Sequence, residues 1–154
     1  MPTYHERARH RVVRATAYYH GEADHIQYGR KSAYGTTLRY GRVRSAAADW
    51  SRYPVGTVFR IKGLPYTYVV DDYGSALVGT NTVDLYKPSR RQMDAWGLRF
   101  VEIEVLRMGS FEESYRVLSS RLRFPHCRQM AEAIVERRPW VVARAAQGSS
   151  RPRS

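Results

Sequence analysis

The segment from Thr82 to Tyr86 carries the clearest β-strand pattern in this chain. Its period of two places Val83 and Leu85 on one face of the strand and Asp84 on the other. If the two aliphatic side chains fill a core, Asp84 must point outward, into whatever groove the surface carries. Composition alone would favour a merely solvated aspartate at this position, so its meaning depends on the rest of the chain.

Other β-forming runs surround this segment, and together they predict a sheet-based domain. They are rich in β-forming residues and are bounded by turns. The runs cover residues 12–19, 58–62, 66–70 and 101–105. Residues 21–44 are rich in Gly, Tyr and polar side chains, which predicts a long loop with short strands. Long loops in compact domains often carry function.

Helix signals appear mainly after the last of these runs. A capping box begins at Ser89 and Gly97 provides a stop, so one short helix is expected between two strands. A second capping box begins at Ser110, and apolar residues follow it at helical spacing. Pro125 should end this second helix, and a further helix is expected over about residues 127–138.

The chain is expected to contain one barrel domain. Strands followed by helices favour a small β-barrel with a helical appendage, and a length of 154 residues suits one such core. The predicted segments are a basic arm at 1–11, the barrel at 12–107, a helical extension at 108–138 and a basic, partly disordered tail at 139–154.

Three aspartates stand among glycines and apolar β-forming residues in a chain that is otherwise strongly basic. They lie in Ala47-Ala48-Asp49-Trp50 followed by Pro54-Val55-Gly56-Thr57, in Asp72-Tyr73-Gly74-Ser75-Ala76-Leu77-Val78-Gly79, and in Val83-Asp84-Leu85-Tyr86. Thr16-Ala17-Tyr18 and Gly35-Thr36-Thr37 precede them. The glycine two positions after Asp72 favours Asp72 over its neighbour Asp71 as the second aspartate. Carboxylates are the usual tools of glycosidic-bond cleavage, where one must hold a proton near neutral pH.

The order and flanks of these segments resemble the three-aspartate (3D) domain over roughly residues 14 to 107. The family pattern reads Ala-Val-Asp-Pro and Pro-Leu-Gly-Thr, then Asp-x-Gly-Gly-Ala-Ile-Lys-Gly, then Ile-Asp-Leu-Tyr. This chain has Trp50 in place of a proline, Ser75 in place of a glycine, and one extra residue between Gly79 and Asp84. The resemblance implies a mainly β fold, a small six-stranded double-psi β-barrel, here with a C-terminal helical extension.

The same family includes barrels related to membrane-bound lytic transglycosylase A. The resemblance therefore implies a peptidoglycan-cleaving enzyme that acts on the MurNAc–GlcNAc β-1,4 bond, with lytic and hydrolytic outcomes both open. The family's third aspartate is the acid, which makes Asp84 the catalytic candidate. Asp72 and Asp49 are assigned to electrostatics and positioning, with hydrogen bonding in a turn as the alternative for Asp49. The candidate substrate-binding residues are Tyr18, Thr36, Trp50, Tyr73 and Gly74.

The charge of the chain points to an anionic partner. It has 26 basic against 14 acidic residues, a net charge of +12, and almost all of the basic residues are arginine. Arginine suits carboxylates and phosphates, so peptidoglycan glycan strands fit as the partner. No recognition helix or RNA-binding strand motif is visible, so no specific nucleic-acid partner is expected. The alternatives are a solvated basic surface, a non-catalytic glycan-binding barrel of the cell envelope, and a basic nucleic-acid-binding protein, a reading that rests on charge alone.

Other classes of site have little support in the sequence. Cys127 is the sole cysteine, which excludes an intrachain disulfide and a thiolate zinc cluster. A group formed by His20, Glu22, Asp24 and His25 lacks a third well-spaced ligand, so we expect no metal and no cofactor. No apolar run approaches the roughly 20 residues that span a bilayer, and no signal peptide is evident. We expect a monomer without a transmembrane segment, located in the cell envelope or periplasm as the resemblance implies.

Overall fold

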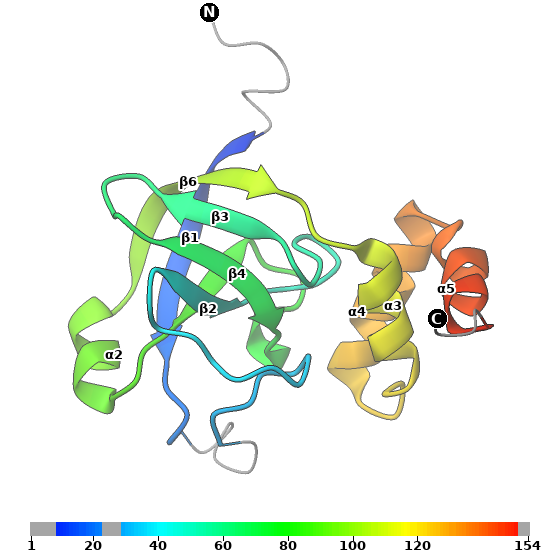
Figure 1. Cartoon of the computed structure of the whole chain (residues 1–154), viewed down its shortest axis with the longest axis horizontal. Helices are drawn as coiled ribbons and strands as arrows, with labels where there is room; N and C mark the ends of the chain where they lie inside the picture. The colour runs from blue at the N-terminus through cyan, green and yellow to red at the C-terminus, as the bar shows by residue number, and fades with distance from the viewer. Residues whose placement is uncertain (1–8, 23–28, 151–154) are drawn as a thin grey trace, which may run out of the picture.

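Six strands of the computed structural model close into a single barrel. The structure describes residues 9–22 and 29–150, with side chains through residue 147. The strands are β1 (His10–Tyr18), β2 (Val43–Ala47), β3 (Val58–Ile61), β4 (Thr67–Asp72), β5 (Thr82–Tyr86) and β6 (Arg99–Arg107). They are joined in the order β1-β5-β2-β4-β3-β6 (Figure 1).

The barrel is mixed. The pairs β1–β5 and β2–β4 are parallel, whereas the other neighbouring strands are antiparallel. Closure of the sheet leaves no open edge between strands. This arrangement confirms the predicted six-stranded barrel and is consistent with a double-psi topology.

Serine caps begin two of the helices. The helices are η2 (Ser75–Leu77), α2 (Arg90–Trp96), α3 (Phe111–Ser119), α4 (Pro125–Arg137) and α5 (Val141–Ser150). The Ser89 side chain accepts a hydrogen bond from the Gln92 amide at the start of α2, and Ser110 caps α3 in the same way. Gly97 ends α2 with a positive φ of 67°. Both predicted capping boxes are therefore helix starts.

Three boundaries differ from those predicted. β1 begins at His10, inside the segment assigned to the basic arm, because residues 10–15 pair with β6. α4 begins at Pro125 rather than near residue 127, since proline suits the first turn of a helix. α5 forms within the segment predicted as a tail, and Val141 and Ala145 are its buried face. The remaining residues of the arm and tail, 1–8 and 151–154, lie outside the described residues.

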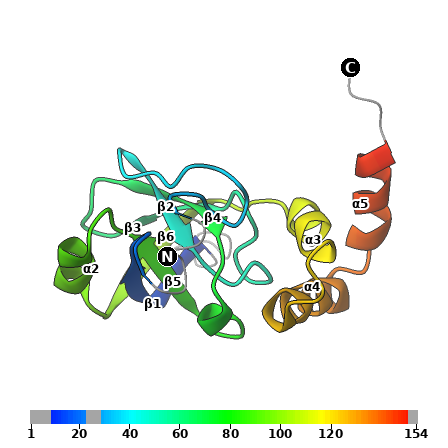
Figure 2. The same ribbon diagram turned by 90° about the horizontal axis from the view of Figure 1, so that it is seen from below.

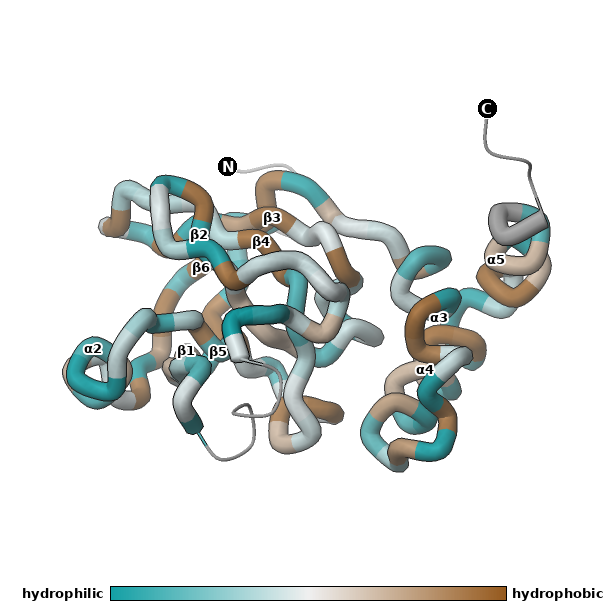
Figure 3. The backbone as a smooth tube through the Cα atoms, turned by 60° about the horizontal axis from the view of Figure 1, so that its bottom comes forward, coloured by the Kyte–Doolittle hydropathy of each residue, from teal (hydrophilic) through white to brown (hydrophobic). Residues whose placement is uncertain are grey.

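The helical extension packs directly against the barrel. α3, α4 and α5 lie together on one side of it, and α2 lies on the opposite side (Figures 1 and 2). Apolar segments of the barrel strands and of α3 appear in Figure 3. Trp50 and Val55 of the barrel and Leu118, Met130 and Ile134 of the extension belong to one buried cluster. Barrel and extension therefore share a continuous hydrophobic core.

Across the described ranges, the helices are too short or too polar for any of them to cross a lipid bilayer.

Candidate active site

Asp84 lies on the outer face of β5, as the period of that strand predicts. Its neighbours Val83 and Leu85 are fully buried in the barrel, whereas Asp84 is half-buried. Thr16 of β1 is its register partner, and the Thr16 hydroxyl donates a hydrogen bond of 2.8 Å to Asp84 Oδ1. Within the described residues no donor bonds to Asp84 Oδ2, so this oxygen can serve a further partner.

The environment of Asp84 favours its protonated form. Burial raises the pKa of Asp84 from an ordinary 3.8 to about 7. The hydrogen bond from Thr16 lowers this pKa, while the negative charges of Glu22 and Asp72 raise it further. A carboxyl group in this setting holds its proton near neutral pH, as a general acid must.

A row of paired residues connects Asp84 to a second aspartate. Ala47 of β2 pairs with Asp84 on one side and with Asp72, the last residue of β4, on the other. Neighbouring strands lie about 4.8 Å apart, which separates the Cα atoms of the two aspartates by about 10 Å. Only the methyl group of Ala47 stands between them in the row, so both carboxylates belong to one outer face.

A β-bulge in β4 determines how the two consecutive aspartates are presented. Pairing with β2 moves from Ala46–Val70 to Ala47–Asp72, so Asp71 is an extra residue in the strand. In a regular strand, Asp71 and Asp72 would point to opposite faces. The bulge instead allows both carboxylates to bond to residues of the outer face.

Asp71 is a member of the site that the sequence did not predict. Its Oδ2 accepts hydrogen bonds from the hydroxyls of Ser45 at 2.7 Å and Thr36 at 3.3 Å. Its Oδ1 is buried and has no hydrogen-bond partner within the described residues. Burial raises the pKa of Asp71 to about 6, against the two hydroxyl bonds that lower it, and the charge of Asp72 adds to the rise. The bulge brings Asp71 into the site, and no pattern in the sequence predicts the bulge.

Asp72 is held in place by hydrogen bonds on all sides. Its carboxylate accepts bonds from the Tyr18 hydroxyl at 3.0 Å and from the amides of Ala33 at 2.9 Å and Tyr73 at 3.0 Å. Its carbonyl oxygen accepts a bond of 2.9 Å from the indole N–H of Trp50. This many partners fix both the position and the orientation of the carboxylate.

Tyr18 bonds to one carboxylate of the outer face, that of Asp72, and is affected by the charges of the other two. Burial raises the pKa of the Tyr18 phenol well above its ordinary value, and the charges of Asp72, Asp71 and Asp84 raise it further. The phenol therefore stays protonated and donates to Asp72. Its ring packs at 5.7 Å from that of Tyr86, its register partner on β5.

Asp49 lies apart from this group and is buried, with 2% of its surface exposed. Its Oδ1 accepts hydrogen bonds from the amide and the hydroxyl of Ser51, and its Oδ2 accepts one from the Gly79 amide at 2.8 Å. The carboxylate thus ties the turn after β2 to the loop before β5. These bonds favour the structural alternative for Asp49.

Two of the predicted substrate-binding residues lie in the carboxylate cluster and one does not. Tyr18 and Thr36 bond to Asp72 and Asp71, respectively. Trp50 is fully buried, so it offers no surface to a sugar ring. The prediction for Trp50 is corrected on this point: its indole supports the backbone of Asp72 from the core side.

Tyr73 and Gly74 follow Asp72 and lead away from the barrel. The Tyr73 hydroxyl accepts a hydrogen bond of 3.0 Å from Arg121 and one of 3.2 Å from the Cys127 thiol. Tyr73 is therefore held by the helical extension. A side chain at Gly74 would press on Leu77 of η2, since an added Cβ would lie 3.3 Å from Leu77 Cδ1.

Comparison with known families identifies the barrel. Residues 44–107 match the 3D domain family. Over these residues the chain is similar to a 3D domain, and the closed six-stranded barrel is consistent with that family. The family is associated with peptidoglycan-related function and is linked to cell-wall lytic enzymes. No curated protein matches the chain.

The matched part of the 3D domain runs from β2 to the end of β6 and contains all three predicted aspartates. β1 lies before it, yet β1 supplies Thr16 and Tyr18 to the site. The site of this 3D domain is therefore completed by a strand outside the matched residues.

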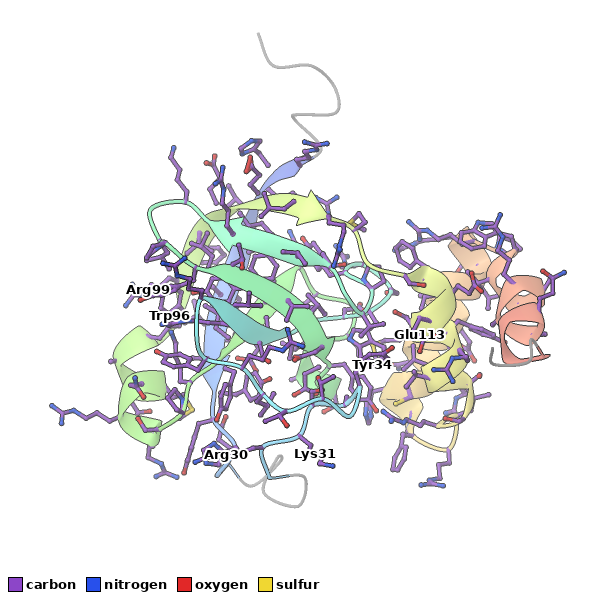
Figure 4. The ribbon with its side chains drawn as sticks, in the orientation of Figure 1. Arg30, Lys31, Tyr34, Trp96, Arg99 and Glu113 are labelled. Atoms are coloured by element: carbon purple, nitrogen blue, oxygen red, sulfur yellow. The ribbon has the colours of Figure 1, made fainter. Side chains whose placement is uncertain are left out.

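The residues directly after β1 also contribute to the site of the 3D domain. His20 Nδ1 lies 2.8 Å from the Tyr86 hydroxyl, and the charge of Glu22 raises the pKa of Asp84. Figure 4 shows Arg30 and Lys31 at the same end of the barrel. The sequence marked His20 and Glu22 only as weak metal candidates. Among the described residues no three or more metal-ligating side chains gather, and Asp24 and His25 lie outside those residues.

Proposed function

We propose that this protein cleaves peptidoglycan glycan strands by lytic transglycosylation, with Asp84 as the acid and base. The observation that carries the proposal is a half-buried carboxyl group on the outer face, with a pKa of about 7 and one oxygen without a donor among the described residues. An acid with this pKa can protonate the oxygen that links MurNAc to GlcNAc at neutral pH.

The reaction needs one carboxyl group that acts twice. Asp84 gives its proton to the glycosidic oxygen, the bond from C1 to that oxygen breaks, and positive charge develops at C1 and the ring oxygen. The 6-hydroxyl of the same sugar then attacks C1, and the Asp84 carboxylate takes the hydroxyl proton. The products are a 1,6-anhydro end and a free hydroxyl on the leaving sugar, and no water is consumed.

Asp72 supports this reaction through its charge. The two carboxylates occupy one row of the outer face, and the negative charge of Asp72 raises the pKa of Asp84. A fixed negative charge also stabilises the positive charge that develops on the sugar. Asp71 and Tyr18 complete the acidic surroundings. We place the protein in the cell envelope on the same grounds, because its substrate is there.

The decisive experiment is digestion of purified peptidoglycan in water labelled with ¹⁸O, followed by mass spectrometry. We expect 1,6-anhydro muropeptides that contain no label. Labelled reducing ends would mean hydrolysis, and the proposal would then fail in its lytic form. Undigested glycan that nevertheless binds the protein would instead assign it to the non-catalytic glycan-binding barrels.

Asp84→Asn tests the acid in the same assay. Loss of the proton donor should lower turnover by about a hundredfold or more. Asp94→Asn is the matched control, because Asp94 is exposed on α2 and the substitution makes the same chemical change there. An Asp84→Asn protein that keeps normal turnover would remove Asp84 from the role.

Stability at two pH values distinguishes lost chemistry from lost folding. The folded pKa of Asp84 lies above its ordinary value, so the wild-type protein should lose stability as the pH rises from about 4 to about 7. Asp84→Asn cannot ionise and keeps that stability, so at pH 8 it should be the more stable protein, by up to about 4 kcal/mol. Urea denaturation at pH 5 and pH 8 measures the difference.

A further inference from the structure

A cavity of about 320 Å³ opens among arginines that come from separate parts of the chain. Arg11 of β1, Arg52 of the turn after β2, and Arg137 and Arg138 at the end of α4 all line it. Of the described residues, none with a carboxylate side chain lines the cavity, and the aspartates of the candidate active site lie outside it. Four arginines thus line a space that the proposed function does not use.

Three of these guanidinium groups have no acidic counterpart in the described part of the chain. There, no ion pair joins Arg52, Arg137 or Arg138 to a carboxylate. Arg138 is partly buried, with its guanidinium 3.6 Å from the centre of the Phe111 ring, and its Nη1 is buried without a hydrogen-bond partner. Burial and the charge of Arg137 lower the pKa of Arg138. The positive charge here is therefore uncompensated, and a bound anion would relieve it.

Two polar side chains that line the same cavity, those of Tyr53 and Asn81, are held by hydrogen bonds. The Tyr53 hydroxyl donates a hydrogen bond of 2.8 Å to Asn81 Oδ1, and the Asn81 amide donates one of 3.3 Å to the Val12 carbonyl. The Arg11 guanidinium lies 5.4 Å from the centre of the Tyr53 ring. The cavity is therefore built on β1 and the start of β5, which are parts of the rigid barrel.

The arrangement of the charges selects the class of anion. A single carboxylate presents two oxygens in one plane, which suits one guanidinium fork. A phosphate group presents its terminal oxygens in tetrahedral directions, and guanidinium groups from different elements can share them. Arg52, Arg137 and Arg138 come from a turn of the barrel and from the end of a helix, so they match the second geometry.

We propose that this cavity binds a phosphate-bearing ligand between the barrel and the helical extension. The ligand would bridge the turn after β2 and the C-terminal end of α4. Binding should therefore stabilise the folded protein as well as fill the cavity. The site goes beyond the proposed cleavage of glycan strands and does not depend on it.

Isothermal titration calorimetry with inorganic pyrophosphate at constant ionic strength tests the proposal. We expect one binding site per chain and a rise in Tm on binding. Arg52→Gln and Arg137→Gln should each weaken binding at least about tenfold. Both residues are exposed, so the variants should fold. Without ligand their Tm should equal or exceed that of the wild type, because one of several like charges is removed.

Arg91→Gln is the matched control, since Arg91 is exposed on α2 at the other side of the barrel and carries the same charge (Figure 1). It should bind pyrophosphate within about twofold of the wild type. Equal weakening in all three variants would show attraction by net charge alone and would overturn the site. Citrate binding as tight as that of pyrophosphate would overturn the phosphate assignment, and no measurable pyrophosphate binding would overturn the proposal entirely.

Discussion

At the scale of single residues, the pKa of Asp84 is the result of influences that raise it and one that lowers it. Burial and two acidic neighbours favour the proton, while the Thr16 hydroxyl favours the charged form. The Thr16 hydrogen bond and the Asp72 charge can each be removed by one substitution of similar size. The alkaline limb of the pH–rate profile should move with the pKa of Asp84, because an acid loses activity as the pH rises through its pKa.

Thr16→Val and Asp72→Asn should move that limb in opposite directions. Thr16→Val removes the hydrogen bond that lowers the pKa of Asp84, so the limb should move to higher pH by about one unit. Asp72→Asn removes a charge that raises this pKa, so the limb should move to lower pH. The measurement is kcat/KM on a soluble glycan from pH 5 to pH 9. Shifts of the same sign in both variants would contradict the assignment of Asp84.

The sequence predicted the position of Asp84 but not that of Asp71, and the difference has a physical cause. Strict alternation in β5 gives each residue one face, and the burial of Val83 and Leu85 follows that rule. The bulge in β4 breaks the rule at Asp71, because a register shift depends on the pairing partner and leaves no periodic signal in its own strand.

At the scale of elements, the helical extension reaches the candidate active site through two hydrogen bonds of the Arg121 side chain. Arg121 donates hydrogen bonds to the Ala33 carbonyl at 2.8 Å and to the Tyr73 hydroxyl at 3.0 Å. The amides of Ala33 and Tyr73 both bond to Asp72. The segment after α3 therefore bonds to two of the three residues that donate to the Asp72 carboxylate.

Arg121→Leu tests whether these two hydrogen bonds matter for catalysis. Loss of two hydrogen bonds should lower the free energy of unfolding by about 2 kcal/mol. It should also release Asp72, so kcat should fall by about tenfold and the alkaline limb should move to lower pH, as in Asp72→Asn. Arg123→Leu is the control, because Arg123 is exposed and makes neither contact. Lower stability with unchanged kcat and pH profile would limit the extension to a structural role.

Local sequence signals predicted a helix correctly where the signal residue itself makes the stabilising contact. The serines at 89 and 110 cap helices because their hydroxyls satisfy the first amides. α5 escaped prediction because its polar, Gly- and Ser-containing end resembles a linker, and its stability depends on packing of Val141 and Ala145. The docking of the extension was equally hidden, since Trp50 and Met130 are in contact across 80 positions.

At the scale of the whole molecule, an acidic face operates within a basic protein. The charges of Glu22 and Asp72 raise the pKa of Asp84, and the charge of Asp72 raises that of Asp71, in a chain with a net charge of +12. The two charge distributions have separate tasks under the proposed function. Excess arginine concentrates the protein on an anionic wall, and the local acids shape the reaction. The closed barrel was implied by the family resemblance, whereas this separation becomes visible only in the folded arrangement.

Salt should therefore affect wall binding and bond cleavage differently. The Debye length falls from about 10 Å at 0.1 M salt to about 3 Å at 1 M, which screens exposed charges but acts less on the buried cluster. Sedimentation of the protein with insoluble peptidoglycan should fall at least about threefold over this range. kcat on a short soluble glycan should change by less than about twofold, because Asp84 and Asp72 interact within the protein. A parallel loss in both assays would mean that surface charge takes part in the reaction itself.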